Sequence, residues 1–301
     1  MSKKILIAGA SGLIGSRLTE LLLQKGYQVS QLSRSKKSGP IPSFIWDVDR
    51  GVMDLEALEG VDTIIHLAGA GVADKRWTES RKKEILESRT RSSALLYKTL
   101  ASANHPVKSV ISASAIGYYG FGFGEKIFTE DSQPGNDYLA QVTKQWEESV
   151  DKISLLNLRV VKLRIGIVLS NKGGALVEMA KPIRWGIGAA LGNGKQYLSW
   201  IHLDDLCAMF IKAVEDETMQ GAYNAVCGDW VTNKALTQLI AKILKRPLLL
   251  PNVPAFVMKI LIGEMAVIVV NGSKISADKI KKTGFVFRYS NLEDALESLK
   301  L

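Results

Sequence analysis

The chain has 301 residues, a formal net charge of +9, 47% hydrophobic residues and 23% charged residues. This balance excludes a disordered chain and allows a sizeable core, in one large domain or in a large domain with a smaller one. The most apolar late segment, 254–270, contains Lys259 and Glu264, so it is predicted to form one or two packed helices rather than a membrane span.

The N-terminal residues lack an apolar segment long enough for a signal peptide, so we expect a cytoplasmic protein with no membrane partner. The two cysteines, Cys207 and Cys227, are too few for a disulfide framework. Together with three histidines they show no spacing typical of metal ligands, and we expect no metal site.

The first elements in the chain form a nucleotide-binding pattern. A short, wholly apolar run at 5–7 is typical of a parallel strand that is covered on both faces. A glycine turn follows at 9–15, then apolar residues at helical spacing as far as Gly26, and then a second strand at 27–32. This order of strand, glycine turn, helix and strand predicts a dinucleotide site.

Each glycine of this turn has a physical role in such a site. Gly9 permits the tight turn, Gly12 lets the backbone approach a pyrophosphate, and Gly15 allows the helix to pack closely on the strand. The start of the helix then offers free N–H groups to the phosphates. The predicted cofactor-binding residues of the turn are Gly9, Ser11, Gly12, Leu13, Ile14 and Gly15.

The end of the second strand indicates which dinucleotide binds. NAD enzymes usually have an acidic residue there, which accepts a hydrogen bond from the ribose 2′-hydroxyl. Here the strand ends with Ser33 and Arg34, and no acidic residue occurs between Glu20 and Asp47. A guanidinium can hold a 2′-phosphate with two charge-assisted hydrogen bonds, which predicts NADP(H). The alternative is an ordinary surface arginine in a loop.

Strands and helices continue to alternate through the first two thirds of the chain. We expect strands at 44–47, 61–68, 107–114 and 158–168, and helices at 78–101 and 138–153. This alternation predicts an α/β fold with a Rossmann-type, doubly wound parallel sheet. The pattern loosens near Gly173. We therefore expect an NADP-binding Rossmann domain at 1–172, to which later segments can return, and a smaller C-terminal substrate lobe at 173–301.

Basic residues are densest from Arg81 to Arg91, where Glu84 and Glu87 interrupt them at helical spacing. A solvated helix face, a phosphate-facing role for one or two of these residues, and nucleic-acid binding would each produce such a run. No nucleic-acid motif accompanies it, so we expect a small-molecule substrate and no nucleic-acid partner. A homo-oligomer is compatible with the sequence.

Three motifs together resemble the extended short-chain dehydrogenases/reductases. They are the glycine turn, His66-Leu67-Ala68-Gly69, and the run from Ser112 to Gly120 that contains Tyr118-Tyr119. Further segments are similar to one atypical subgroup, called epimerase-family or NAD-dependent epimerase/dehydratase-like proteins, some of which carry an old label of cell-division inhibitor. These segments are Arg76-Trp77, Ser88-Arg89, 192–196, 199–202 and several positions between 251 and 285, so the resemblance spans essentially the whole chain. The last of these positions imply that 173–301 contains, besides the substrate lobe, a family-specific C-terminal domain.

The resemblance implies roles for individual residues. Ser33 and Arg34 would contact the 2′-phosphate, while Asp47 and Val48 would flank the adenine. Arg89 takes the place of an asparagine that is common in extended relatives, and Ser114 matches a residue that hydrogen-bonds a substrate oxygen. The remaining residues that the resemblance places along the cofactor are Leu67, Ala68, Gly69, Glu84 and, near the nicotinamide, Val168.

The sequence departs from the family at the catalytic base. The usual Tyr-x-x-x-Lys pair places an ammonium group one helical turn from the phenol. Here Tyr138 is followed four residues later by Val142, and Lys144 lies six residues from the tyrosine, so the pair is absent. We expect Tyr118 or Tyr119 to donate the proton instead, to an oxygen held by Ser114, with Arg89 lowering the phenol pKa. The alternative is that both tyrosines only pack the turn before Gly120.

Trp77, Trp200 and His202 fall in predicted loops or at helix starts, and we assign them to the substrate pocket. The alternatives are core packing for the two tryptophans and a structural hydrogen bond for the histidine, which precedes a predicted N-cap pair at Asp204 and Asp205. Two functions remain open. One is an NADP(H)-dependent oxidoreductase or epimerase acting on a small carbonyl, hydroxyl or sugar-nucleotide-like compound. The other is an NADP(H) sensor or partner-docking module that has lost catalysis.

Overall fold

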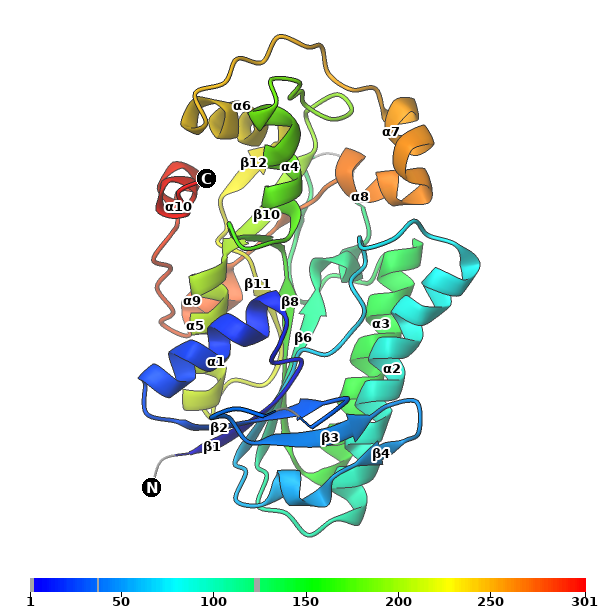
Figure 1. Ribbon diagram of the computed structural model, residues 1–301, viewed down its shortest axis with the longest axis vertical. Coiled ribbons are helices and arrows are strands. Elements are labelled where there is room, and N and C mark those ends of the chain that lie inside the picture. The colour runs from blue at the N-terminus through cyan, green and yellow to red at the C-terminus, as the bar shows by residue number, and fades with distance from the viewer. Residues whose placement is uncertain (1–2, 37, 122–124) are drawn as a thin grey trace.

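A central eight-stranded sheet organises the computed structural model, which describes residues 3–36, 38–121 and 125–301 (Figure 1). The strand order is β11-β8-β6-β5-β1-β2-β3-β4, and every pair is parallel except the antiparallel edge pair of β3 and β4. The predicted Rossmann-type sheet is therefore confirmed. Its strands are β1 Lys4–Ala8, β2 Gln28–Ser33, β3 Ser43–Asp47, β4 Val52–Met53, β5 Thr63–His66, β6 Ser109–Ala115, β8 Arg159–Ile165 and β11 Gly221–Ala225.

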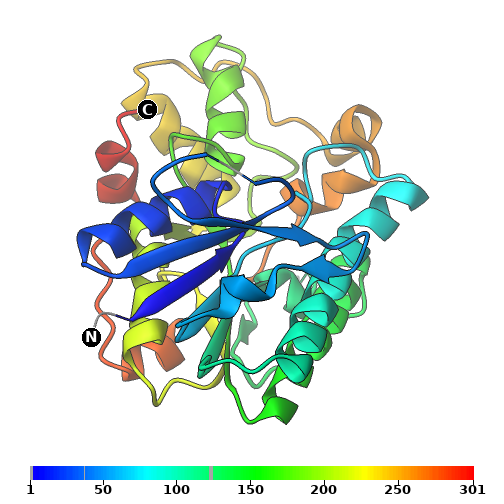
Figure 2. The same ribbon diagram turned by 60° about the horizontal axis from the view of Figure 1, so that its bottom comes forward.

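Helices cover both faces of this sheet, which explains why β1, β5 and β6 consist almost entirely of buried residues. Helices α1 (Leu13–Gln24) and α5 (Leu203–Glu215) pack together on one face, while α2 (Glu79–Ser102) and α3 (Tyr138–Asp151) pack together on the other. Figure 2 shows this division from the edge formed by β3 and β4. The layers bring the carboxyl ends of β1, β2 and β5 together at one edge, where open α/β sheets bind ligands.

The last predicted strand of the main sheet is shorter than expected. The sequence predicted a strand at 158–168, but β8 ends at Ile165, and the chain passes through Gly166 into β9 (Ile167–Leu169) of a second sheet. A Cβ atom at Gly166 would lie 2.5 Å from the carbonyl oxygen of Ser199, so only glycine lets the two backbones approach here. Because apolar residues continue on both sides of Gly166, the hydrophobic pattern does not reveal that the strand ends there.

The second lobe is built around a three-stranded sheet in the order β12-β10-β9 (Figure 1). Strand β10 (Tyr197–His202) runs parallel to β9 and antiparallel to β12 (Trp230–Thr232). The helices packed around this sheet are α4 Ala175–Arg184, α6 Asn233–Ile243 and α10 Leu292–Ser298. Between the strands of this lobe, α5 and β11 return to the main sheet, so segments on both sides of position 172 complete the Rossmann unit.

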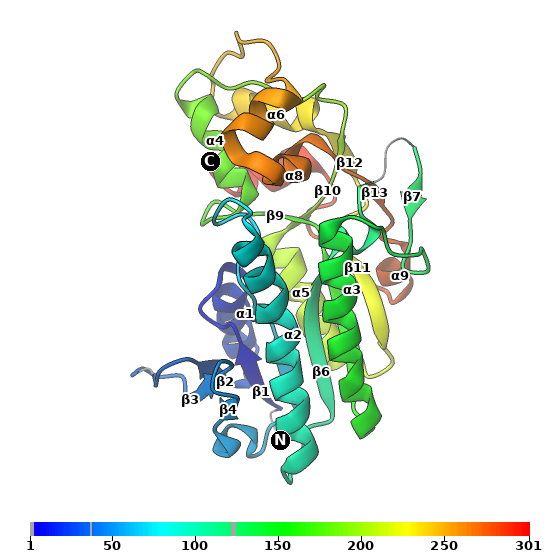
Figure 3. The same ribbon diagram turned by 90° about the vertical axis from the view of Figure 1, so that its right-hand side faces the viewer.

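The late apolar segment forms the helices that the sequence predicted. Helix α7 (Ala255–Ile262) is followed by a short 3-10 helix η4 (Gly263–Met265) and by α8 (Ala266–Val270). In the described ranges, no helix is both long enough and apolar enough to cross a bilayer. Figure 3 shows α7 and α8 above the ends of α2 and α3. The remaining elements are η1 Leu55–Leu58, η2 Ile116–Tyr119, β7 Ile127–Phe128, η3 Lys152–Leu156, β13 Lys274–Ile275 and α9 Asp278–Lys282.

Candidate cofactor site

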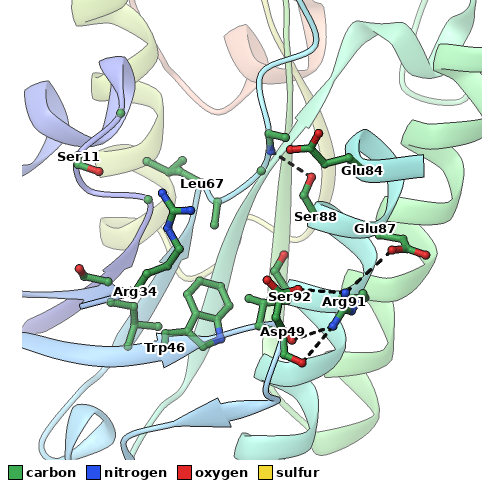
Figure 4. Close-up of a pocket in the computed structure, with 18 of the residues that line it drawn as sticks. Ser11, Arg34, Trp46, Asp49, Leu67, Glu84, Glu87, Ser88, Arg91 and Ser92 are labelled. Carbon is green, nitrogen blue, oxygen red and sulfur yellow. Dashed lines mark hydrogen bonds and ion pairs between the residues drawn. The ribbon is translucent and has the colours of Figure 1, made fainter. Parts of the chain in front are cut away.

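A cavity of about 930 Å³ lies at the carboxyl ends of β1, β2 and β5 (Figure 4). Its walls are the glycine turn, the end of β2, the residues after β3, the loop after β5 and one side of α2. Ten of the residues expected to bind cofactor line it: Gly9, Ser11, Gly12, Ser33, Arg34, Val48, Leu67, Ala68, Gly69 and Glu84.

The glycine turn shapes one wall of the cavity. Gly9 has φ +89°, and a Cβ atom there would lie 2.9 Å from the carbonyl carbon of Leu67. A Cβ atom at Gly15 would lie 2.2 Å from the carbonyl oxygen of Gly9, so this glycine allows α1 to start directly against the turn. At Gly12 a Cβ atom would make only a 3.5 Å contact. Gly12 therefore contributes open backbone toward the cavity rather than packing.

Arg34 extends from the end of β2 into the cavity, between the glycine turn and the opposite wall (Figure 4). Its side chain is exposed, and it forms no ion pair with any residue in the described ranges. The neighbouring Ser33 hydroxyl donates to the carbonyl of Ser35 at 2.6 Å and so fixes the loop that follows the strand. An unpaired guanidinium at this place presents a positive charge to any anion in the cavity.

The wall opposite the glycine turn comes from the residues after β3 and from α2. Trp46 and Val48 line it, while the Asp47 carboxylate turns back to accept hydrogen bonds from the backbone of Asp49 and Arg50, each at 3.0 Å. Arg91 of α2 is 3.1 Å from the Asp49 carboxylate and so closes this side. The sequence identified Val48 but not Trp46 or Arg91 as part of the wall.

The loop after β5 is supported from behind by a buried histidine. His66 is fully buried, and its Nε2 lies 3.2 Å from the hydroxyl of Ser92 and 3.3 Å from that of Ser93. Burial, and to a lesser extent the charge of Arg89, lower the pKa of His66 to about 4. The imidazole is therefore neutral at pH 7, and it holds Leu67 and the following residues in place against α2.

Arg89 lies behind this loop rather than in the cavity lining. A Cβ atom at Gly69 would meet the Arg89 side chain at 3.3 Å, and the Arg89 guanidinium stacks 5.1 Å from the Trp146 ring. One of its nitrogens donates to the carbonyl of Ile85 at 2.9 Å. Burial lowers the pKa of Arg89 to about 10, and the opposing effect of Tyr138 is smaller. The phenol with which Arg89 interacts electrostatically is Tyr138, whereas the sequence suggested Tyr118 or Tyr119.

The basic run of α2 contributes to the site at three positions. Arg81, Lys83 and Arg91 all line the cavity. A phosphate-facing role for one or two residues of this run is compatible with that position and stays a prediction. Arg81 is buried and forms an ion pair with Glu84 at 2.7 Å, and this bond lowers the pKa of that carboxyl. On the same helix the Ser88 hydroxyl accepts a hydrogen bond from the backbone of Ala70 at 3.0 Å and anchors the β5 loop.

The Ser114 hydroxyl belongs to a buried network of hydrogen bonds and an ion pair. Its hydroxyl donates to Glu147 at 2.6 Å, and the same carboxylate receives two hydrogen bonds from Arg164, at 2.8 and 3.0 Å. Burial alone would raise the pKa of Glu147, but the Arg164 guanidinium outweighs it, and the pKa lies below its usual value. Because its proton points at Glu147, Ser114 can orient a substrate hydroxyl only as an acceptor.

The two tyrosines that follow differ in their surroundings. The Tyr119 hydroxyl is buried, donates to Asn224 at 2.6 Å and accepts from Arg164 at 2.9 Å, so it belongs to the same network. Burial raises the pKa of Tyr119 to about 12. Tyr118 is half-buried, and its hydroxyl bonds to nothing in the described ranges. The Arg164 guanidinium lies 3.6 Å from the Tyr118 ring centre and supplies the cation that we had expected from Arg89.

The three residues assigned to the substrate pocket lie inside cores. Trp200 is 1% exposed in the second lobe, and Trp77 packs between α2 and α3 with its indole nitrogen bonded to the carbonyl of Val72. His202 is buried; its Nδ1 accepts from the backbone of Asp204 at 3.1 Å and caps α5. The alternative interpretations therefore fit these positions: core packing for the two tryptophans and a structural hydrogen bond for the histidine. The histidine, not Asp204 or Asp205, is the N-cap.

The other expected cofactor residues lie beside the cavity without lining it. Leu13 and Ile14 occupy the first turn of α1 and are half-buried against the core. Val168 lies on β9, paired with Ile201 of β10. In the described ranges, no group of His, Cys, Asp and Glu residues could hold a metal ion.

The fold and this cavity define a Rossmann-type protein of the extended short-chain dehydrogenase kind. The chain belongs to the NAD dependent epimerase/dehydratase family, whose sequence model matches residues 5–225. A second model, described as a domain of unknown function, DUF1731, matches residues 253–299.

Similar proteins span the whole chain. The epimerase family protein YfhF of Bacillus subtilis is 34% identical, over 98% of this chain and 97% of its own length. An SDR39U1 homolog from the chloroplast of Arabidopsis thaliana is also 34% identical, over 97% of this chain and 85% of its own. Both are described as epimerase family proteins, not as cell-division inhibitors.

Solved structures confirm the fold at full length. The crystal structure of human epimerase family protein SDR39U1 with NADPH is 29% identical, with a TM-score of 0.87 over 99% of both chains. A nucleoside-diphosphate sugar epimerase from Corynebacterium glutamicum is also 29% identical, with a TM-score of 0.81 over 98% of this chain and 57% of that one. MoeE5 in complex with UDP-glucuronic acid and NAD is 20% identical and supports the fold alone.

Proposed function

We propose that the chain binds NADP(H) in the cavity beside the glycine turn and acts as an NADP(H)-dependent oxidoreductase or epimerase. The observation that carries the proposal is the unpaired Arg34 guanidinium inside that cavity, at a strand end without an acidic residue. The NADPH in the human relative supports the same cofactor. Arg34 and Ser33 would hold the 2′-phosphate, and the backbone of the glycine turn would hold the pyrophosphate.

The cofactor part of this proposal is tested by replacing Arg34. We expect the unmodified protein to bind NADPH more tightly than NADH, by roughly 1–3 kcal/mol for a charge-assisted phosphate contact. Arg34→Asp should narrow or invert this preference, because the new carboxylate repels the phosphate and accepts from the 2′-hydroxyl. Isothermal titration with both cofactors measures the difference. Equal affinities in the unmodified protein would refute the assignment of Arg34.

The reaction that we propose acts on a small carbonyl, hydroxyl or sugar-nucleotide-like compound. When bound, the nicotinamide supplies or accepts a hydride, and the protein must supply orientation and a proton. We assign the proton transfer to Tyr118, because its hydroxyl is not engaged elsewhere in the described ranges. The Arg164 guanidinium lies 3.6 Å from the centre of its ring and holds the ring in place. Ser114 would position a substrate hydroxyl as an acceptor.

The proposed role of Tyr118 in proton transfer is tested by comparing two variants, Tyr118→Phe and Tyr119→Phe. Tyr118→Phe should lower turnover by about 10²–10⁴-fold and leave NADPH affinity nearly unchanged, because it removes a proton donor and nothing that holds the cofactor. Tyr119→Phe removes a buried hydroxyl between Asn224 and Arg164, so it should reduce stability more than turnover. The readouts are NADPH oxidation and epimer formation over a panel of carbonyl compounds and sugar nucleotides.

Two results of that panel would change the proposal. If Tyr118→Phe retains full turnover, Tyr118 is not the proton donor, and Tyr138, the phenol that interacts electrostatically with Arg89, takes its place as the candidate. If the unmodified protein binds NADPH tightly but transforms no compound in the panel, the sensor or docking function replaces the enzyme. Both outcomes leave the cofactor assignment intact, since it has its own test.

We also propose a cytoplasmic location. Cys207 and Cys227 are both free and buried thiols, which accords with a reducing compartment. Fluorescence microscopy of a tagged full-length protein tests the location.

A further inference from the structure

One end of the molecule exposes an unusual number of large apolar side chains. Helix α7 has the sequence AFVMKILI, and none of its residues is buried. Phe256 is 66% exposed and Ile260 is 70% exposed. A surface helix normally buries one apolar stripe against the protein, and α7 instead presents much of its apolar surface to solvent.

The neighbouring segments add to the same surface. Trp185, directly after α4, is 77% exposed, and Leu249, before α7, is 79% exposed. The two segments lie side by side, because the backbones of Gly192 and Val253 share a 2.8 Å hydrogen bond and α4 packs on α6. Figure 1 shows the end of α4, the link from α6 and α7 together at the top of the molecule. We call the surface formed by 181–187 and 245–261 the apolar–basic end.

The charge of this region has one sign. Residues 179–203 contain no Asp or Glu, and neither do residues 230–263. The same two stretches contain eight lysines and arginines: Lys181, Arg184, Lys195, Lys234, Lys242, Lys245, Arg246 and Lys259. In the described ranges, ion pairs engage only Lys181, with Glu178, and Lys242, with Glu293. Within the apolar–basic end itself the cations are Lys181, Arg184, Lys245, Arg246 and Lys259, and all of them except Lys181 form no ion pair in the described ranges.

We propose that the apolar–basic end attaches the protein to the surface of an anionic lipid bilayer. Aromatic and aliphatic side chains would enter the boundary between headgroups and acyl chains, and the lysines and arginines would contact the anionic headgroups. Trp185 is suited to this place because its indole has both an apolar body and a polar N–H. The inference is independent of the proposed enzymatic function.

Charge favours a lipid surface over a second copy of the chain. A two-fold dimer through this end would bring two identical basic surfaces together, and like charges at an interface oppose association. Surface attachment departs from our expectation of no membrane partner, although it agrees with the expectation of no membrane span. A helix as short as α7, about 12 Å at 1.5 Å per residue, can lie in the interface but cannot cross a bilayer.

The experiment is sedimentation of the full-length protein with vesicles. We expect binding to vesicles of phosphatidylglycerol and phosphatidylcholine, weak binding to phosphatidylcholine alone, and loss of binding at high salt. The double variant Phe256→Ser/Ile260→Ser should bind at least about tenfold more weakly, because it removes buried CH₂ and ring carbons from the interface. Arg184→Gln/Arg246→Gln should lose about fivefold per charge.

A matched control comes from η3, which follows α3 and is not part of the apolar–basic end. Leu155 is 73% exposed and Lys152 is also exposed, so Leu155→Ser/Lys152→Gln removes the same kinds of group from another place. The control should bind vesicles as the unmodified protein does. Thermal unfolding of each variant verifies that it is folded, and all substitutions are at exposed side chains, where the effect on stability is small.

Four outcomes would overturn the proposal. One is equal binding to anionic and neutral vesicles, and another is unchanged binding by both double variants. The third is a dimer of the unmodified protein, seen by light scattering, that Phe256→Ser/Ile260→Ser dissociates while vesicles bind neither form. That result would assign the surface to a second copy. Binding of a soluble acidic polypeptide that depends on the same residues, without vesicle binding, would assign it to a protein partner.

Discussion

Single residues at the candidate site divide into those that face the cavity and those that support it. Arg34 and Arg81 face the cavity, whereas His66 and Arg89 lie behind the β5 loop. The sequence pointed to Arg34 and Arg89 alike, because a pattern gives position along a strand or helix but not the depth of a side chain. Depth decides chemistry here: burial makes His66 neutral, while exposure leaves Arg34 free to bind an anion.

The Glu147–Arg164 pair is the clearest residue-scale departure from the expected catalytic arrangement. The sequence predicted a substrate-binding Ser114 and a tyrosine activated by Arg89. The structure has Ser114 and Tyr119 joined to a buried carboxylate and guanidinium. No local signal marks this network, because its members come from β6, η2, α3 and β8, which meet only in the folded sheet. A buried pair of this kind is costly to break at one member and fixes the geometry around it.

The buried His66 predicts how stability depends on pH. Its pKa is about 4 in the folded protein and about 6.5 in an unfolded chain. The unfolded chain therefore takes up the proton first, and the stability that a neutral His66 provides is lost as the pH falls from about 6.5 toward 4. Between pH 7 and pH 5 the loss due to His66 should be about 2 kcal/mol.

Urea unfolding at the two pH values measures this loss, and His66→Gln isolates it. The variant has no titrating group at this position, so its stability should fall less over the same interval. His202 also has a lowered pKa through burial, and its contribution remains in both proteins. An equal pH dependence in the variant and the unmodified protein would mean that His66 is not buried in its neutral form.

At the scale of elements, two glycines of the turn between β1 and α1 have different roles: Gly15 is needed for packing and Gly12 for cofactor binding. A methyl group at Gly15 would overlap the backbone of the turn, whereas one at Gly12 would only touch it. Gly15→Ala should therefore destabilise the fold by about 1–3 kcal/mol or more. Gly12→Ala should leave stability nearly unchanged but weaken NADPH binding, because the methyl group stands where the pyrophosphate approaches.

Thermal unfolding and NADPH titration of both variants check this contrast. Gly26→Ala is not a suitable control, because Gly26 has φ +83° and any side chain there is strained. Leu23→Ala is better, since Leu23 is on α1 and exposed. If Gly12→Ala and Gly15→Ala lose stability equally, Gly12 is needed for packing as much as Gly15, and the proposed difference between them is wrong.

Elements with a strong local signal could be predicted from the sequence. The helix expected at 138–153 and the strand expected at 107–114 agree with α3 and β6 to within two residues, because caps, glycines and apolar periodicity mark their ends. The short strands β4, β7 and β13 were not predicted, since two residues carry no periodicity. The break at Gly166 was also missed, because it depends on contact with Ser199, which is distant in sequence.

At the scale of the whole molecule, the two halves of the chain are interleaved. Helix α5 follows the second-lobe strand β10 yet packs on α1, and β11 pairs with β8 at one edge of the main sheet. The C-terminal segment returns as well: the Asp205 carboxylate accepts hydrogen bonds from the backbones of Arg288 and Tyr289, each at 2.9 Å. The later segments that were expected to return to the Rossmann domain thus include α5 and β11.

This interleaving predicts that residues 1–172 do not fold alone. The fragment lacks α5, whose Leu206, Met209 and Phe210 are fully buried, so the sheet face that they cover would be exposed to water. Burying three such side chains contributes roughly 1.5–3 kcal/mol each, which is comparable to the whole stability of a typical domain. The fragment should show no cooperative urea transition, whereas the full chain should show one whose midpoint rises with NADPH. A cooperative, NADPH-sensitive transition in the fragment would show instead that the N-terminal strands and helices form a self-sufficient domain.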